Sequence, residues 1–229
     1  MSKIYIETSI VSYLTARPSN NLIAAAWQKE TIDWWETQKD RFDLFISEVV
    51  IEEASRGDET ASARRLAALE DIKFLQLNEK SVALSKALIA EGGMAKKALE
   101  DALHVAISAV EEVDFLLTWN CKHINNAEMK PNIRKIIEAH GYRCPEIATP
   151  IELRGGDKMT DEILKELWEI KESIAKEHGN SIDGLAEYYL RKQSIRNDRL
   201  HRKEREEKAD GNREKPHDSP SHTIARTGP

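Results

Sequence analysis

Cysteine is scarce in this chain of 229 residues, since Cys121 and Cys144 are the only two. A small secreted domain held together by disulfides would carry many more cysteines at short intervals. The two cysteines also lack the spacing of a zinc site. We therefore interpret both as reduced thiols of a cytosolic protein.

Long apolar runs are also missing. No segment approaches the roughly 20 apolar residues that a membrane span needs. The first apolar run, residues 4–6, is short and is followed at once by the acid Glu7, which does not fit a signal peptide. The sequence therefore predicts a soluble, cytoplasmic protein.

An excess of basic residues is the third absence, because the formal net charge is −6. Proteins that hold nucleic acid by general electrostatic attraction usually have a basic balance. The composition therefore excludes that mode of binding. Any nucleic acid has to be held at a local site, for example through a metal ion.

What the sequence does contain is an alternation of short apolar strands and amphipathic helices. This order is typical of an α/β fold with a parallel sheet of four or five strands covered by helices on both faces. The expected strands are 4–6, 42–47, 73–77 and 114–118, with a short edge strand between prolines at 145–150. The expected helices are 10–16, 21–39, 49–54, 61–69, 82–90, 97–110 and 124–140.

The composition changes after Arg154, which predicts three parts. Residues 1–154 form the α/β domain. Residues 155–195 form a helical segment, with helices expected at 161–177 and 181–193. Residues 196–229 are mostly charged and have too few apolar side chains to offset their ordering entropy, so we expect a disordered tail.

The first strand ends on Glu7, and the hydroxyls of Thr8 and Ser9 follow it. Ligands bind at the carboxyl ends of strands in a parallel sheet, and a hydroxyl there caps the next helix. Considered alone, Glu7 fits the exposed last residue of a strand better than it fits a ligand. The other acids of the chain decide between the two.

Asp101 is the most informative acid. It lies in the expected helix 97–110 on the same face as the apolar residues Ala98 and Val105. A carboxylate on a core-facing stripe is costly unless it is paired or bound to a metal. His104 fits a satisfied surface histidine, or one that supports a ligand, better than it fits a ligand.

Polar residues at comparable places now form a set: Glu7 after the first strand, Glu53 after the second, Asp101, and Asn120 after the fourth. Two carboxylates about 4 Å apart repel by about 4 kcal/mol at an effective dielectric of 20. If these residues converge, the site needs a cation, and Mg²⁺ or Mn²⁺ suits a site of oxygen ligands. Such an ion can activate water and neutralise a phosphodiester.

Four segments together resemble the PIN domain in the form found in VapC-type toxins of bacterial type II toxin–antitoxin pairs. They occur in the proper order, and the resemblance covers about residues 1–150. It implies a metal-dependent ribonuclease with a parallel sheet and an acidic cluster. The four segments are 4–9, 47–54, 101–106 and 116–120.

The resemblance also assigns roles to residues of this chain. It implies Glu7, Glu53 and Asp101 as metal ligands and Asn120 at the fourth position of the site. Glu52 is the alternative to Glu53. The hydroxyl residues that would orient the site are Thr8, Ser9 and Thr118.

Two positions differ from the pattern usual in the family. Glu7 stands where aspartate is usual, and its side chain reaches about 1.5 Å further. Asn120 also stands where aspartate is usual, and it can offer an oxygen but no charge. Fewer charges should hold the metal more weakly.

Residues 161–193 resemble the short antitoxin-like peptides encoded next to this branch of toxins. The resemblance implies that this segment packs on its own or a neighbouring PIN domain and restrains it. Alternatively, the segment is a helical extension that only dimerises or covers apolar surface.

The favoured function is a metal-dependent endoribonuclease of the toxin type. The alternative is a catalytically weak PIN fold that acts as an interaction or regulatory module. The expected partners are an RNA substrate and either an antitoxin or the chain's own C-terminal segment. A homodimer is also expected, with the apolar helices between Ile10 and Trp35 as its contact face.

Overall fold

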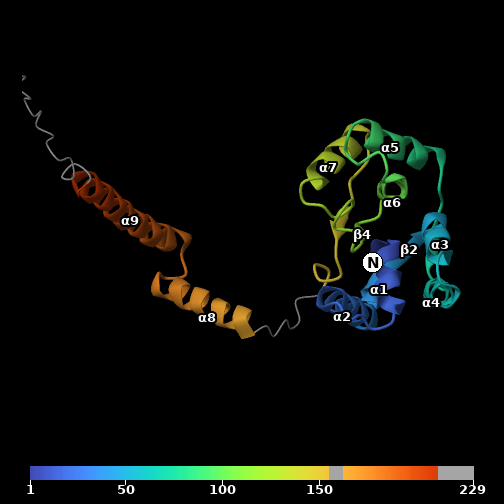
Figure 1. Ribbon diagram of the computed structural model, residues 1–229, viewed down its shortest axis with the longest axis horizontal. Coiled ribbons are helices and arrows are strands. Elements are labelled where there is room, and N and C mark those ends of the chain that lie inside the picture. Colours follow the sequence, from blue (N-terminus) through green and yellow to red (C-terminus); the bar gives the residue numbers. More distant parts are fainter. Residues whose placement is uncertain (155–161, 211–229) are drawn as a thin grey trace, which may run out of the picture. The chain divides into compact units, whose positions relative to one another are not determined.

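The computed structural model describes residues 1–154 and 162–210 (Figure 1). The chain divides into two compact units, Met1–Asp157 and Lys158–Pro229. Among the described residues, no helix combines the length and the apolar character that crossing a membrane requires.

The first unit is built on a five-stranded parallel sheet, which confirms the predicted fold class. The strand order is β3-β2-β1-β4-β5, so β1 is central and the predicted edge strand is at an edge. The strands are β1 (Ser2–Ile6), β2 (Phe42–Ser47), β3 (Lys73–Leu75), β4 (Phe115–Leu117) and β5 (Glu146–Ala148).

Helices cover both faces of this sheet. In Figure 1, α5, α6 and α7 lie on one side of β4, and α1 and α2 lie on the other. The α-helices of this unit are α1 (Thr8–Thr15), α2 (Leu22–Thr37), α3 (Glu48–Ser55), α4 (Glu59–Leu69), α5 (Glu79–Ala90), α6 (Leu99–Val110) and α7 (Lys130–Ala139), with a 3₁₀ turn at Lys39–Arg41.

The centre of the core lies on β1, where Ile4, Tyr5 and Ile6 have no solvent exposure. Strands of a parallel sheet are buried on both faces, which is why this run is continuously apolar or aromatic. Ile6 pairs with Leu117 of β4. The residues that follow these two strands therefore start side by side at one edge of the sheet.

One helix boundary in this unit was wrong. The helix expected from Ile124 begins at Lys130, and the residues before it form turns. The side chain of Asn126 accepts the backbone N–H groups of Glu128 and Met129, and such a local bond competes with the helix. Pro131 then lies in the first turn of α7, where proline is well tolerated.

The second unit contains α8 (Glu162–Glu177) and α9 (Ile182–Asp210). The turn between them places Gly179 and Asn180 at positive φ, as the predicted Gly-Asn stop requires. The rings of His178 and Tyr188 lie 4.3 Å apart across this turn. This contact lies beside the turn that connects the two helices.

The expected end of the second helix near Gln193 was also wrong, because α9 continues to Asp210. This stretch is rich in Arg, Lys and Glu, which favour helix. Acids also precede bases by four residues in the sequence, as in Asp198 and Arg202, and such pairs support a helix. Of the predicted tail, residues 211–229 lie outside the described part, as do residues 155–161 at the start of the predicted helical segment.

Candidate metal centre

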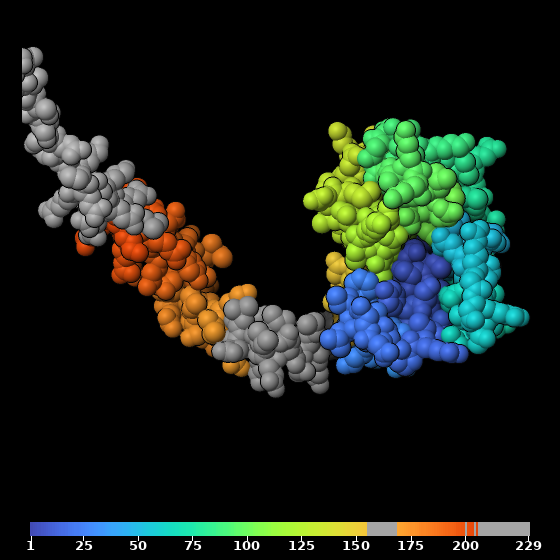
Figure 2. All heavy atoms as spheres, in the orientation of Figure 1, coloured from blue at the N-terminus to red at the C-terminus, as the bar shows by residue number. Residues whose placement is uncertain are grey.

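The predicted acids come from three elements that meet at the carboxyl edge of the sheet. Glu7 follows β1 and occupies the N-cap position of α1, Glu53 lies on α3, and Asp101 lies in the first turn of α6. Figure 2 shows the N-terminal segment, in dark blue, recessed between the cyan and green segments that contain α3 and α6.

Glu7 is held by hydroxyls on both sides. Its side chain is buried, with 5% exposure. Ser9 donates a hydrogen bond to Glu7 Oε2, and Thr118, which follows β4, donates to the same oxygen at 2.6 Å. Of the three hydroxyl residues expected to orient the site, Ser9 and Thr118 contact Glu7.

Glu53 is held in the same manner from two other elements. Thr8 donates its hydroxyl to Glu53 Oε2, and His104 Nε2 lies 3.1 Å from that oxygen. The third predicted hydroxyl, Thr8, thus serves Glu53. A neutral or charged imidazole can donate here, because an ionised carboxylate only accepts.

These bonds leave one oxygen of each acid for a cation. All side-chain hydrogen bonds of Glu7 and Glu53 in the described part of the chain reach Oε2, which leaves Oε1 without a protein donor. Ligand atoms of Glu7, Glu53 and His104 lie within 4.8 Å of one another. Ligands about 2.1 Å from a shared Mg²⁺ lie at most about 4.2 Å apart. Glu7 and Glu53 could therefore share a small divalent ion after a slight adjustment, whereas Asp101 is not among the residues whose ligand atoms lie within this distance of one another, and both ring nitrogens of His104 already contact protein groups.

Asp101 is fixed by the predicted fourth residue of the site. Asn120 Nδ2 donates to Asp101 Oδ1 at 2.8 Å, and Asn120 Oδ1 accepts the backbone N–H of His123 at 3.0 Å. A backbone N–H can only donate, so this contact fixes the orientation of the amide. Asn120 therefore orients Asp101 and does not turn its oxygen freely toward an ion.

The alternative residue Glu52 points elsewhere. Its carboxylate pairs with Arg56 one turn further along α3, at 3.0 Å, and both side chains are largely exposed. Of the two neighbouring glutamates, Glu53 is the one that the structure brings to Glu7.

The electrostatics reflect the crowding of acids. Burial raises the pKa of Asp101, and the charges of Glu7 and Glu53 raise it further. Burial also opposes the charged forms of Glu53 and His104. Their mutual hydrogen bond and charges outweigh it, lowering the pKa of Glu53 and raising that of His104. The site thus favours positive charge.

Sequence reasoning assigned no role at this centre to Tyr5 or Ser47, and it left His104 as either a surface histidine or one that supports a ligand. His104 is fully buried and contacts Tyr5 as well as Glu53, and Tyr5 in turn contacts Ser47. The available signals were the position of His104 one turn after Asp101 and a tyrosine two residues before Glu7.

The stacked side chains of Trp27 and Trp119 form an aromatic wall beside the site. The backbone N–H of Trp119 donates to Ser9 Oγ at 2.8 Å, and Ser9 in turn donates to Glu7. The indole of Trp119 stacks on Trp27 with ring centroids 5.1 Å apart and donates to Thr31 Oγ1 at 2.7 Å. The wall thereby anchors the loop after β4 to α2.

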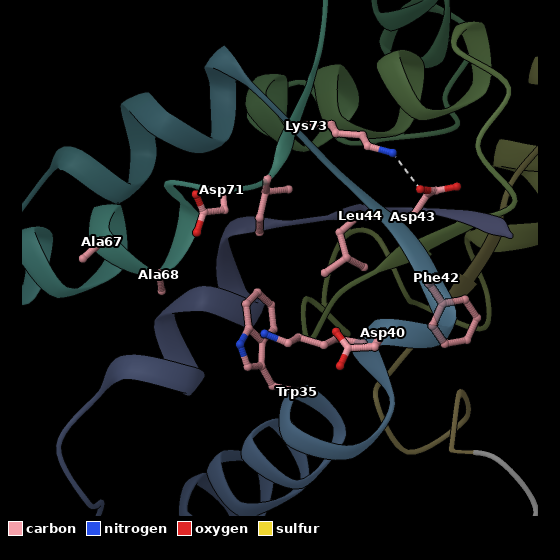
Figure 3. A pocket seen from close by; sticks show the side chains of 11 residues that line it. Trp35, Asp40, Phe42, Asp43, Leu44, Ala67, Ala68, Asp71 and Lys73 are labelled. Atoms are coloured by element: carbon pink, nitrogen blue, oxygen red, sulfur yellow. Dashed lines mark hydrogen bonds and ion pairs between the residues drawn. The ribbon is translucent and has the colours of Figure 1, made fainter.

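A separate pocket of about 390 Å³ lies at the opposite end of the strands. Figure 3 shows it beside Phe42 and Lys73, the first residues of β2 and β3, with Lys73 paired to Asp43 at 2.7 Å. None of the predicted site residues lines this pocket. Its lining contains three aspartates and two lysines, and we assign it no part in the metal centre.

Two solved structures have chains of similar fold. One is VapBC2 from Rickettsia felis bound to a DNA fragment from its promoter, with 14% identity and a TM-score of 0.43, covering 64% of this chain and 98% of that one. The other is VapBC-1 from nontypeable Haemophilus influenzae, with 12% identity and a TM-score of 0.41, covering 65% and 98%. No family model and no curated protein matches the chain.

Proposed function

We propose that this chain is a metal-dependent endoribonuclease of the toxin type, in which Glu7, Glu53 and Asp101 hold Mg²⁺ or Mn²⁺. The observation that carries the proposal is the shared arrangement of Glu7 and Glu53. Each acid is fixed through Oε2, and the Oε1 of each has no protein donor among the described residues. Ligand atoms of the two acids lie within 4.8 Å of each other.

The residues around the acids have supporting roles in this proposal. Thr8, Ser9 and Thr118 keep the two glutamates in place, and Asn120 keeps Asp101 in place. A bound divalent ion would neutralise charge on a phosphodiester and make water a better nucleophile. RNA is the proposed substrate because of the motif resemblance described above.

Cation binding and RNA cleavage by the full chain test the proposal. We expect Mn²⁺ to bind, and RNA to be cleaved with Mn²⁺ or Mg²⁺ but not with a chelator. Glu7→Gln and Asp101→Asn should weaken Mn²⁺ binding and abolish cleavage. Unchanged Mn²⁺ affinity in both variants would show that the ligands are assigned wrongly.

The proposed partner of the nuclease is an antitoxin, either a separate protein or the chain's own segment 155–195. Apart from the motif resemblance of 161–193, the support is the surface of the second unit. Apolar side chains there are exposed, among them Ile170, Ile182 and Leu190, and they would be available to a partner. The homodimer stays a prediction.

A further inference from the structure

A chain of hydrogen-bonded side chains runs from the interior of the first unit to Glu53. Ser47 Oγ lies 2.6 Å from Tyr5 OH, and Tyr5 OH lies 2.8 Å from His104 Nδ1. His104 Nε2 then lies 3.1 Å from Glu53 Oε2. Ser47, Tyr5 and His104 have no solvent exposure, so water does not replace any of these contacts.

When the His104 ring is neutral, the donors and acceptors of these hydrogen bonds fit one direction; when it is protonated, Nδ1 donates to Tyr5 and the contacts remain. An ionised Glu53 only accepts, so Nε2 of His104 carries the hydrogen that faces it. In the neutral ring Nδ1 then accepts, and Tyr5 donates its hydroxyl to it. Ser47 can donate to Tyr5 in turn. Each side chain therefore fixes the next, and the order ends at the carboxylate.

The position of Ser47 is independent evidence that this series of hydrogen bonds has a role beyond local packing. Ser47 occupies the N-cap position of α3, where a serine hydroxyl usually accepts a backbone N–H and stabilises the helix. Here the side chain makes no capping bond and contacts Tyr5 instead. The helix that carries Glu53 thus forgoes its cap in favour of the buried chain.

Tyr5, the second member of this series of hydrogen bonds, is anchored in the central strand of the sheet. Tyr5 lies on β1, which pairs with β2 on one side and β4 on the other. Glu53, by contrast, is on a short helix, and its side chain is 26% exposed. A free glutamate there would sample several rotamers, and a fixed imidazole restricts it.

We propose that His104, Tyr5 and Ser47 are positioning residues that hold Glu53 in the orientation in which it binds a divalent cation. The inference rests on the proposed metal site. Partners of this kind, which hydrogen-bond a metal ligand from behind, typically change metal affinity by 10–100-fold when they are removed.

The competing explanation is that these contacts only satisfy buried polar groups. Removing a hydroxyl would then reduce the stability of the fold by the same amount with and without metal. Positioning predicts something different, because a loosened Glu53 weakens Mn²⁺ binding itself. The stabilisation that Mn²⁺ gives to the folded state would then shrink.

The test uses the full chain and Mn²⁺ as the probe. Calorimetric titration and urea unfolding with and without Mn²⁺ are carried out on Tyr5→Phe, Ser47→Ala and His104→Gln. Tyr142→Phe is the matched control, since Tyr142 packs against the core outside this chain of contacts. We expect Tyr5→Phe to lower Mn²⁺ affinity at least about tenfold, Ser47→Ala to lower it less, and Tyr142→Phe to leave it unchanged.

A double-mutant cycle adds a second readout. If Tyr5 acts through His104, Tyr5→Phe should change Mn²⁺ affinity little in a His104→Leu background, because linked residues are not additive. Wild-type Mn²⁺ affinity in Tyr5→Phe, or fully additive losses in the cycle, would overturn the positioning role and leave the proposed metal site intact. No Mn²⁺ binding by the wild-type chain would overturn both.

Discussion

Asn120 donates its side-chain amide to Asp101 at 2.8 Å and accepts the backbone N–H of His123 with its own oxygen. The residue that was expected to offer an oxygen to the ion therefore holds a neighbouring acid instead. The charge of the residue at position 120 should therefore affect both the stability of the metal-free protein and its affinity for a cation.

Asn120→Asp should make the metal-free protein less stable and should increase the affinity of the site for Mn²⁺. The new carboxylate cannot donate to Asp101 and repels it, so we expect the free energy of unfolding without metal to fall by about 1–3 kcal/mol. Mn²⁺ affinity should rise about tenfold, since even part of the roughly 4 kcal/mol between charges about 4 Å apart suffices. Asn120→Ala is the control, and equal or weaker Mn²⁺ binding by Asn120→Asp would contradict this reading.

Asp101→Asn should stabilise the metal-free protein. The pKa of Asp101 is raised in the folded state, so its ionisation at neutral pH works against folding. An asparagine oxygen can still accept from Asn120. We expect a gain of about 0.5–2 kcal/mol in urea unfolding at pH 7. A loss of stability at that pH would show that the charge of Asp101 is compensated by the protein alone.

The metal-free protein should lose stability as the pH rises above neutrality. The pKa of His104 is raised above the value of about 6.5 expected in the unfolded chain. The stability that protonated His104 contributes is therefore fully present below about pH 6.5, and it is lost as the pH rises through the pKa of His104 in the folded state. The pKa of Glu53 is lowered in the folded state, so the stability that its ionised carboxylate contributes is lost only at acid pH.

Urea unfolding between pH 5.5 and 9 checks this dependence. His104→Gln should flatten the curve on its alkaline side, because glutamine does not titrate. The same alkaline slope in wild type and His104→Gln would assign the effect to another group.

Thr31→Val should loosen the attachment of the loop after β4. It leaves the indole N–H of Trp119 without its acceptor in the core, which costs about 1–3 kcal/mol. Thr31→Ser keeps the hydroxyl and should cost much less. Thermal unfolding compares the two, and equal losses would mean that the methyl group of Thr31 matters more than its hydrogen bond.

Removing the second unit should release the proposed nuclease. A chain cut after Arg154 keeps the contacts of that arginine with Glu30 and Asp33 at 2.7 and 3.2 Å. If the segment restrains the site, RNA cleavage and growth inhibition should increase, on the order of tenfold for a typical coupling between sites. No increase in either would show that the segment does not restrain the chain that carries it.

Much of the first unit was predictable because the local pattern of apolar residues is enough to identify most of its strands and helices. Short apolar runs gave five strands, and parallel order followed from the helices between them. Glu7 and Glu53 could be brought together from sequence for the same reason, since residues that end parallel strands share an edge. The role of His104 could not, because its two partners, Tyr5 and Glu53, are 99 and 51 residues away.

The errors at α7 and α9 have a different origin. An asparagine turn at Asn126 delays a helix that the apolar pattern alone would start earlier. Helix α9 extends through a charged stretch in which the side chains whose burial is described are exposed. Intrinsic helix propensity and charge spacing favour the helix there, and an apolar pattern gives no signal.

The central position of β1 affects the order in which parts of the protein should unfold. Glu7 and Tyr5 are carried by a strand that is hydrogen-bonded on both sides, and such strands usually open only when the whole domain unfolds. The backbone amides of residues 4–6 should therefore exchange with deuterium among the slowest in the chain. The metal centre would then survive partial melting of the periphery, and on heating it should be lost together with the sheet.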